Sequence, residues 1–229
     1  IASVDQYIDL NPLAENVNHK AVRAAYLSWG YLLRKSVCDC LDIESNELDL
    51  GFRIANKEGQ VFFVERLENG AGYCNYLNSD AKIAREALID PLRVDGRLYK
   101  ELVLEKHGEE CMGSCYDCLR DYYNQEFHSV LDWRLAFDMA RLSQQSGSEI
   151  SFNIVYWKKF IEKIATKVAQ KYKGTVNKIE SGLYLIESKN KRCLLTHPFW
   201  SKEYVETLKR KIDGDVSSLS VFDAMRRGR

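Results

Sequence analysis

The stretch Cys111–Asn124, CMGSCYDCLRDYYN, places three of the chain's seven cysteines within eight residues. Cys115 and Cys118 have C-x-x-C spacing, and Cys111 adds a C-x3-C spacing before them. Two cysteines separated by two residues can bind one metal ion, because the chain forms a tight turn between them. Gly113 and Ser114 favour a turn just ahead of Cys115. The spacing therefore predicts a metal site.

A structural Zn²⁺ site takes four ligands, so one ligand must come from outside this cluster. Cys74, which ends a glycine-rich turn, is the first candidate, His128 is the second and His107 the third. Four cysteines, or three cysteines with one histidine, make a closed site that stabilises a fold. Two alternatives stay open: a redox C-x-x-C pair, which needs a thioredoxin-like setting, and an iron–sulfur cluster on four thiolates.

The wider composition favours a soluble protein with reduced thiols. The chain has 229 residues, 45% of them hydrophobic, but no apolar run long enough for a membrane span. No signal-peptide pattern follows Ile1, and seven is an odd number for a disulfide scaffold. We therefore expect a cytoplasmic protein with no membrane partner. Because the chain opens on Ile1 and not on Met, we also expect a fragment of a longer polypeptide.

Charge and periodicity predict two modules. Residues 151–229 contain 17 Lys and Arg against 8 Asp and Glu, whereas the rest has a matching acidic excess. The polar stretch 143–150 is the candidate linker, which gives a zinc-binding domain over 1–145 and a basic module over 151–229. Apolar spacing predicts helices at 17–41, 80–92 and 131–142, a hairpin at Leu48–Ala55 and Val61–Leu67, then a further helix from Trp157, strands at Leu183–Glu187 and Arg192–Thr196, and a helix at 201–211. The expected fold is α+β: a zinc-stapled domain of helices around a small sheet, followed by a small basic α/β module.

The basic module offers candidate DNA contacts. They are the lysines of its first helix: Lys158, Lys159, Lys163, Lys167 and Lys171. Such side chains contact phosphates without reading sequence. The alternative is that the opposite charges only pair the two halves or separate subunits. Glu187-Ser188-Lys189 has the D/E-x-K spacing of metal-dependent nucleases, but it falls where a hairpin turn is expected, so we interpret it as an exposed turn. A degenerate nuclease-like domain remains an alternative.

Two segments carry a family resemblance. They are CLRDYYNQEFHSVLDWRLAFDMA (Cys118–Ala140) and LENGAGYC (Leu67–Cys74), and over roughly residues 17–145 the chain resembles the MrfA-type zinc-binding (MZB) domain. The form ending in LDWRLA is most similar to DrmB-like helicase-partner subunits of the DISARM anti-phage system. The resemblance implies that Cys74, Cys111, Cys115 and Cys118 hold Zn²⁺. It also implies a non-catalytic role in antiviral defence, in contact with DNA and a separate helicase subunit.

The chain contains no G-x-x-x-x-G-K-[ST] loop, so a P-loop ATP site is not expected within it. The alternative role is that of a C-terminal accessory domain of a DEAD/DEAH-type helicase whose motor lies upstream.

Overall fold

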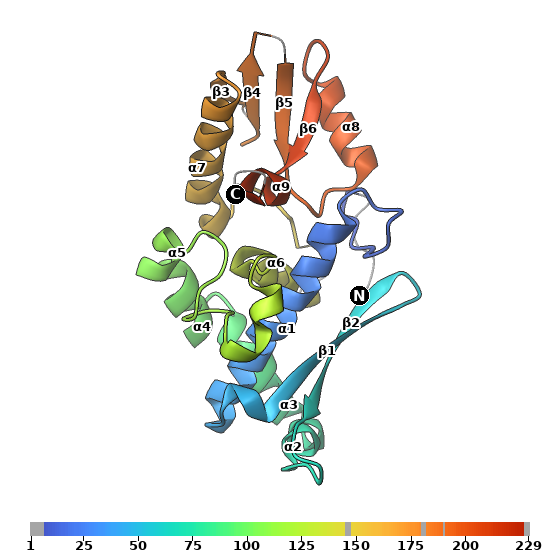
Figure 1. The fold of residues 1–229 in the computed structure, drawn as a ribbon, viewed down its shortest axis with the longest axis vertical. Helices are drawn as coiled ribbons and strands as arrows, with labels where there is room; N and C mark the ends of the chain where they lie inside the picture. Colours follow the sequence, from blue (N-terminus) through green and yellow to red (C-terminus); the bar gives the residue numbers. More distant parts are fainter. Residues whose placement is uncertain (1–6, 145–147, 180–181, 190, 227–229) are drawn as a thin grey trace. The chain divides into compact units, whose positions relative to one another are not determined.

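The computed structural model describes residues 7–144, 148–179, 182–189 and 191–226 (Figure 1). The chain divides into two compact units, which we call the central unit, Arg23–Ser146, and the terminal unit, Ile1–Val22 with Gly147–Arg229. Residues 7–22 thus belong with the C-terminal part, whereas the sequence places them in the first domain. The middle of the expected linker, 145–147, lies outside the described residues.

The described elements make an α+β fold, as predicted, with two small sheets. Up to the end of the central unit they are α1 (His19–Leu41), η1 (Ser45–Glu47), β1 (Leu48–Ala55), β2 (Glu58–Glu65), α2 (Tyr73–Ser79), α3 (Ala81–Leu88), η2 (Asp90–Leu92), α4 (Arg97–Tyr99), η3 (Lys100–Leu104), α5 (Lys106–Glu110), η4 (Tyr122–Phe127) and α6 (Trp133–Gln144). The terminal unit adds α7 (Val155–Lys171), β3 (Thr175–Lys178), β4 (Tyr184–Ser188), β5 (Lys191–Thr196), α8 (Lys202–Arg210), β6 (Ser217–Ser220) and α9 (Val221–Arg226).

In the central unit, β1 and β2 form a hairpin that packs on α1. Its register runs from Leu48 opposite Glu65 to Ala55 opposite Glu58. A two-residue turn joins the strands, and Asn56 has φ +50° and Lys57 φ +65°. Positive φ at both turn residues matches the right-handed twist of the strands. This turn is tighter than the one expected from the sequence, so β2 begins and ends earlier than the predicted strand.

Glycines let the hairpin approach α1 closely. A Cβ atom on Gly30, in α1, would lie 2.7 Å from a Leu50 methyl group, and one on Gly59 would lie 2.6 Å from the Tyr26 ring. Contacts that short do not occur between real side chains, so neither position accepts a larger residue without movement. The helix and hairpin thereby bury the side chains of Leu32, Val37 and Leu48.

The terminal unit is built on a four-stranded sheet with the order β3-β4-β5-β6 (Figure 1). The pairs β3–β4 and β4–β5 are antiparallel, while β5 and β6 are parallel, because α8 returns the chain between them. Helix α7 packs against β3 and β4 with a face that includes Trp157, Phe160 and Ile164. Two strands of this sheet, β3 and β6, are absent from the sequence-based expectation.

Candidate metal centre

The chain from α5 to the start of η4 brings four potential metal ligands together. Helix α5 contains His107, and Cys111 follows as its C-cap, with its amide donating to the His107 carbonyl at 2.9 Å. Residues four apart lie on one face of a helix, so the imidazole and the first thiol point to the same side. The loop after Cys111 returns Cys115 and Cys118 to that side.

The loop around Cys115 is a tight knuckle. Its carbonyl oxygen accepts hydrogen bonds from the amides of Cys118, Leu119 and Arg120, at 3.3, 3.2 and 2.9 Å. The Cys115 amide lies 3.1 Å from the Cys118 sulfur, to which it donates. These bonds hold the two sulfur atoms on the same side of the turn, 3.7 Å apart.

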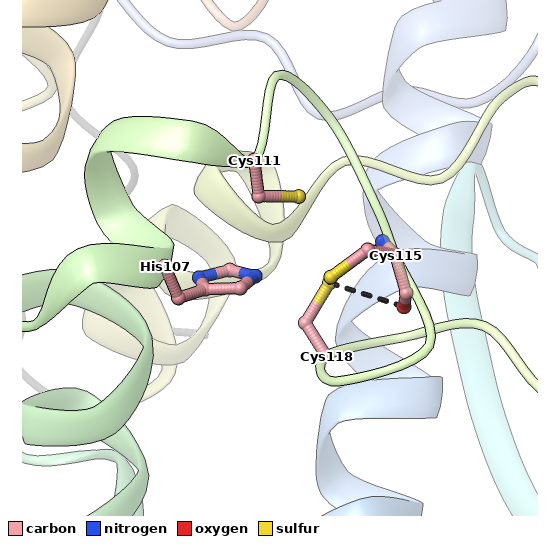
Figure 2. Close-up of side chains that lie close together, drawn as sticks. All are labelled: His107, Cys111, Cys115 and Cys118. Atoms are coloured by element: carbon pink, nitrogen blue, oxygen red, sulfur yellow. Dashed lines mark hydrogen bonds between the residues drawn. The ribbon is translucent and has the colours of Figure 1, made fainter.

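The four ligand atoms form one compact group. The sulfurs of Cys111, Cys115 and Cys118 and an imidazole nitrogen of His107 all lie within 4.8 Å of one another. Figure 2 shows His107 and Cys111 on one side of a common space and the Cys115–Cys118 turn on the other. The group could hold a metal ion, and all seven cysteines of the chain are free thiols.

The orientation of His107 suits a metal ligand. Its Nδ1 lies 2.9 Å from the Leu102 carbonyl oxygen, so Nδ1 carries the proton and donates this bond. Its Nε2 is buried and has no hydrogen-bond partner among the described residues. A histidine ligand commonly donates its second ring N–H to a carbonyl, which leaves the other nitrogen's lone pair for the metal.

The electrostatics of the group favour a thiolate. Hydrogen bonding to Cys118 lowers the pKa of the Cys111 thiol, and the same interaction raises the pKa of Cys118. Burial disfavours the charged form of His107, but the nearby Cys111 thiol and the Leu102 carbonyl raise its pKa overall. Cys111 is therefore the thiol of the group that loses its proton most readily. A bound metal ion would also displace the protons of the other two thiols.

The first two residues of α6 support the group. Trp133 donates from its backbone amide to the Gly113 carbonyl at 2.9 Å and from its indole to the Cys111 carbonyl at 3.2 Å. The His107 ring packs against the indole, with centroids 5.4 Å apart. Arg134 also donates to the Cys111 carbonyl, at 3.1 Å. This part of LDWRLA therefore serves to fix the cysteine loop.

Two of the predicted fourth ligands lie elsewhere. Cys74 has its sulfur 3.9 Å from the Phe63 carbonyl and packs against the buried cluster that contains Val37 and Leu48. The ring of His128 is held by the Asn124 side chain at 2.8 Å and the Asp121 carbonyl at 3.1 Å. The structure instead brings in His107, the third candidate. Its H-x3-C spacing to Cys111 on one helical face is the sequence signal that identifies it.

The glycine-rich turn before Cys74 binds an internal anion. The Glu65 carboxylate accepts hydrogen bonds from the amides of Gly72 and Cys74, at 2.7 and 2.8 Å. The Cys74 amide is the main cause of a lowered Glu65 pKa. Backbone amides in a glycine-rich turn of this kind can cradle a phosphate, but in the structure the Glu65 carboxylate occupies them.

The five candidate DNA-contacting lysines all lie on the exposed face of α7: Lys158, Lys159, Lys163, Lys167 and Lys171. The opposite face is buried in the terminal unit. Glu162 lies among the lysines and pairs with Lys178 at 3.4 Å, so the row contains one carboxylate. The face is therefore predominantly, but not uniformly, basic.

The nuclease-like triplet lies at the end of β4. Glu187 forms an ion pair with Arg192 at 2.7 Å and a hydrogen bond with Asn177. Lys189 is exposed in the turn that follows β4, as expected for a hairpin turn. Metal-dependent nucleases with this spacing also need a carboxylate upstream, and the nearest acid before Glu187, Glu180, lies outside the described residues. Among the residues that the structure describes, Glu187 belongs to no group of three or more potential metal ligands.

The protein therefore contains a compact Cys3His group that could hold a metal ion. Comparisons with family models, with curated proteins and with solved structures found no match for this chain. Within the described ranges, no helix combines the length and the apolar character that crossing a membrane requires.

Proposed function

We propose that His107, Cys111, Cys115 and Cys118 bind one structural Zn²⁺ ion. The observation that carries this proposal is the convergence of three sulfurs and one nitrogen within 4.8 Å. Two thiolates bound to one Zn²⁺ at about 2.3 Å lie about 3.8 Å apart in a tetrahedron. The 3.7 Å between the Cys115 and Cys118 sulfurs fits that spacing.

The donor set favours a structural role over a catalytic one. Four protein ligands fill a tetrahedral zinc shell and leave no position for water or substrate. The ion would tie α5 to the Cys115–Cys118 turn, and the Cys111 carbonyl would tie both to α6 through Trp133. Three soft thiolates and an imidazole select Zn²⁺ over Mg²⁺ or Ca²⁺, which prefer oxygen. A reducing cytoplasm, which keeps the thiols available, is the compartment that we propose.

We further propose that α7 contacts DNA through its exposed lysines. The support is the row of lysines on one face of a helix whose other face is buried, in the segment 151–229, which has a net charge of +9. Such a row neutralises phosphates and binds duplexes of any sequence, with strong dependence on salt. The role beside a separate helicase subunit in anti-phage defence is proposed from the sequence resemblance alone.

Zinc content tests the first proposal. We expect purified wild-type protein to contain one zinc per chain by inductively coupled plasma mass spectrometry. The Cys118→Ser variant should lose it, whereas the matched control Cys74→Ser should keep it. Loss of zinc from Cys74→Ser together with its retention by His107→Ala would instead favour the ligand set predicted from the sequence.

Filter binding to duplex DNA at two salt concentrations tests the second proposal. Replacing Lys159, Lys163 and Lys167 with Gln should weaken binding and make it less dependent on salt. The slope should fall by roughly one for each phosphate that the variant no longer neutralises. Replacing the exposed Lys82 and Lys106 of the central unit is the matched control and should change neither affinity nor slope. Equal effects of the two sets would remove α7 as the DNA-contacting surface.

A further inference from the structure

A buried guanidinium lies beside the candidate metal centre. Arg134 is 2% exposed, and its side chain is held in two ways. One terminal nitrogen donates to the Cys111 carbonyl at 3.1 Å, and the guanidinium carbon lies 4.2 Å from the centroid of the Trp133 ring. The cation is therefore fixed against the same cysteine and the same indole that form the wall of the site.

The charge of the occupied centre needs a partner. Three thiolates, one neutral imidazole and one Zn²⁺ carry a net charge of −1. Cys111 and Cys118 are 8% and 3% exposed, so little water reaches this charge. An uncompensated charge in such surroundings is costly, and a nearby opposite charge offsets that cost.

Arg134 keeps its charge despite its burial, because a guanidinium in a protein is not deprotonated at neutral pH. Asp132, 1% exposed, lies next to it in the chain and accepts a hydrogen bond from the Arg134 amide at 3.1 Å. The guanidinium therefore supplies a fixed positive charge at the Cys111 carbonyl.

We propose that Arg134 is a positioning residue that strengthens zinc binding by compensating the −1 charge of the Cys3His centre. The inference rests on the proposed zinc binding. The charge of the Arg134 side chain, and not only its packing, would then contribute to zinc affinity. Without the guanidinium, the folded chain would hold an anionic centre next to the buried Asp132 carboxylate, and zinc would bind more weakly.

Zinc affinity, measured by competition with a chromophoric chelator, tests the charge. Arg134→Met keeps the apolar stem, and we expect zinc affinity to fall about 10–100-fold, the range found for residues that orient metal ligands. Arg134→Lys keeps a positive charge but loses the planar fork that packs on Trp133, so its loss of affinity should be smaller than that of Arg134→Met. Arg141→Met, two turns further along α6, is the matched control and should bind zinc as wild type does. An affinity in Arg134→Lys no higher than in Arg134→Met, or a loss of about 100-fold in Arg134→Lys where Arg134→Met does not fold, would overturn the proposal.

A double-mutant cycle separates charge from packing. Cys115→His converts the centre to a neutral set of two cysteines and two histidines, so Arg134→Met should cost less than about threefold in that background. An equal loss in both backgrounds would show that Arg134 acts only through packing and would overturn the inference. A wild-type protein without zinc would instead refute the proposed function itself. One zinc per wild-type chain with unchanged affinity in Arg134→Met would overturn the inference alone.

Discussion

The backbone amide of Asp132 donates a 2.9 Å hydrogen bond to the hydroxyl oxygen of Ser28, 104 positions earlier in the chain. Both residues are buried, and the Ser28 hydroxyl donates in turn to the Ala24 carbonyl within α1 at 2.6 Å. One side chain therefore joins α1 to the residue just before α6. Because Trp133 and Arg134 follow immediately and both hold Cys111, α1 indirectly supports the cysteine loop.

Ser28→Ala should destabilise the central unit. The change leaves a buried amide without its acceptor, which costs about 1–3 kcal/mol. Urea unfolding followed by circular dichroism measures this as a lower midpoint with an unchanged slope. The control is Ser143→Ala, which removes a hydroxyl bonded to the Ala140 carbonyl one turn back. A midpoint in Ser28→Ala equal to that of Ser143→Ala would contradict the assigned role.

Because the pKa of the Glu65 carboxylate is lowered in the folded protein, we expect the protein to lose stability in acid. Because hydrogen bonds lower its folded-state pKa below the unfolded value, its contribution is complete above the unfolded pKa and disappears as the pH falls through the folded pKa. Glu65→Gln should therefore melt below wild type at pH 7, and the gap should close as the pH drops below about 4. Glu68→Gln, a change in the loop that follows β2, should show no such gap. A gap of constant size from pH 7 to pH 3 would show that ionisation is not involved.

Neighbouring cysteines of α1 should differ in reactivity. Burial raises the pKa of Cys38 to about 11, whereas Cys40 is exposed. The thiolate is the reactive form, so iodoacetamide at pH 8 should modify Cys40 in the native protein and leave Cys38 unmodified until urea is added. Peptide mass spectrometry reads both sites in one experiment. Early labelling of Cys38 would indicate that the α1–hairpin core opens in the native state.

Removing the metal should loosen one part of the chain. Treating zinc-loaded protein with a chelator should speed amide hydrogen exchange in α5, in the Cys111–Cys118 loop and at the start of α6, because the proposed ion would join these segments. Exchange in α7 should not change. Hydrogen–deuterium exchange with mass spectrometry reads all of these segments, and a uniform increase over the whole chain would show that the ion supports more than its own loop.

Local spacing made part of this site predictable from the sequence. The knuckle of Cys115 and Cys118 depends on a short turn, so C-x-x-C spacing was sufficient to find it. The fourth candidate ligand, His107, depends on where α5 begins, and a helix of only Lys106–Glu110 gives almost no periodic signal. Cys74 was favoured because it follows a glycine turn, but that turn serves the carboxylate of Glu65, a contact that depends on tertiary structure.

The fold shows the same contrast between local spacing, which can be recognised in the sequence, and tertiary contacts, which cannot. Long amphipathic helices such as α1 and α7 were predicted because their apolar residues recur at helical spacing over many turns. The strands β3 and β6 were missed because TVNK and SSLS lack apolar alternation, and only pairing with β4 and β5 makes them strands. The exposure of the α7 lysines follows directly from the helical pattern, whereas the burial of Arg134 contradicts ordinary side-chain preference and required the structure.

All four candidate ligands lie in one short segment between His107 and Cys118. Closing a short loop restricts the chain little, so under the proposed zinc binding the segment could capture an ion while later parts of the polypeptide are still being synthesised. A site that included Cys74 would have to wait for two remote segments to meet. A metal-bound loop would then offer an early nucleus onto which α6 docks once Trp133 has left the ribosome.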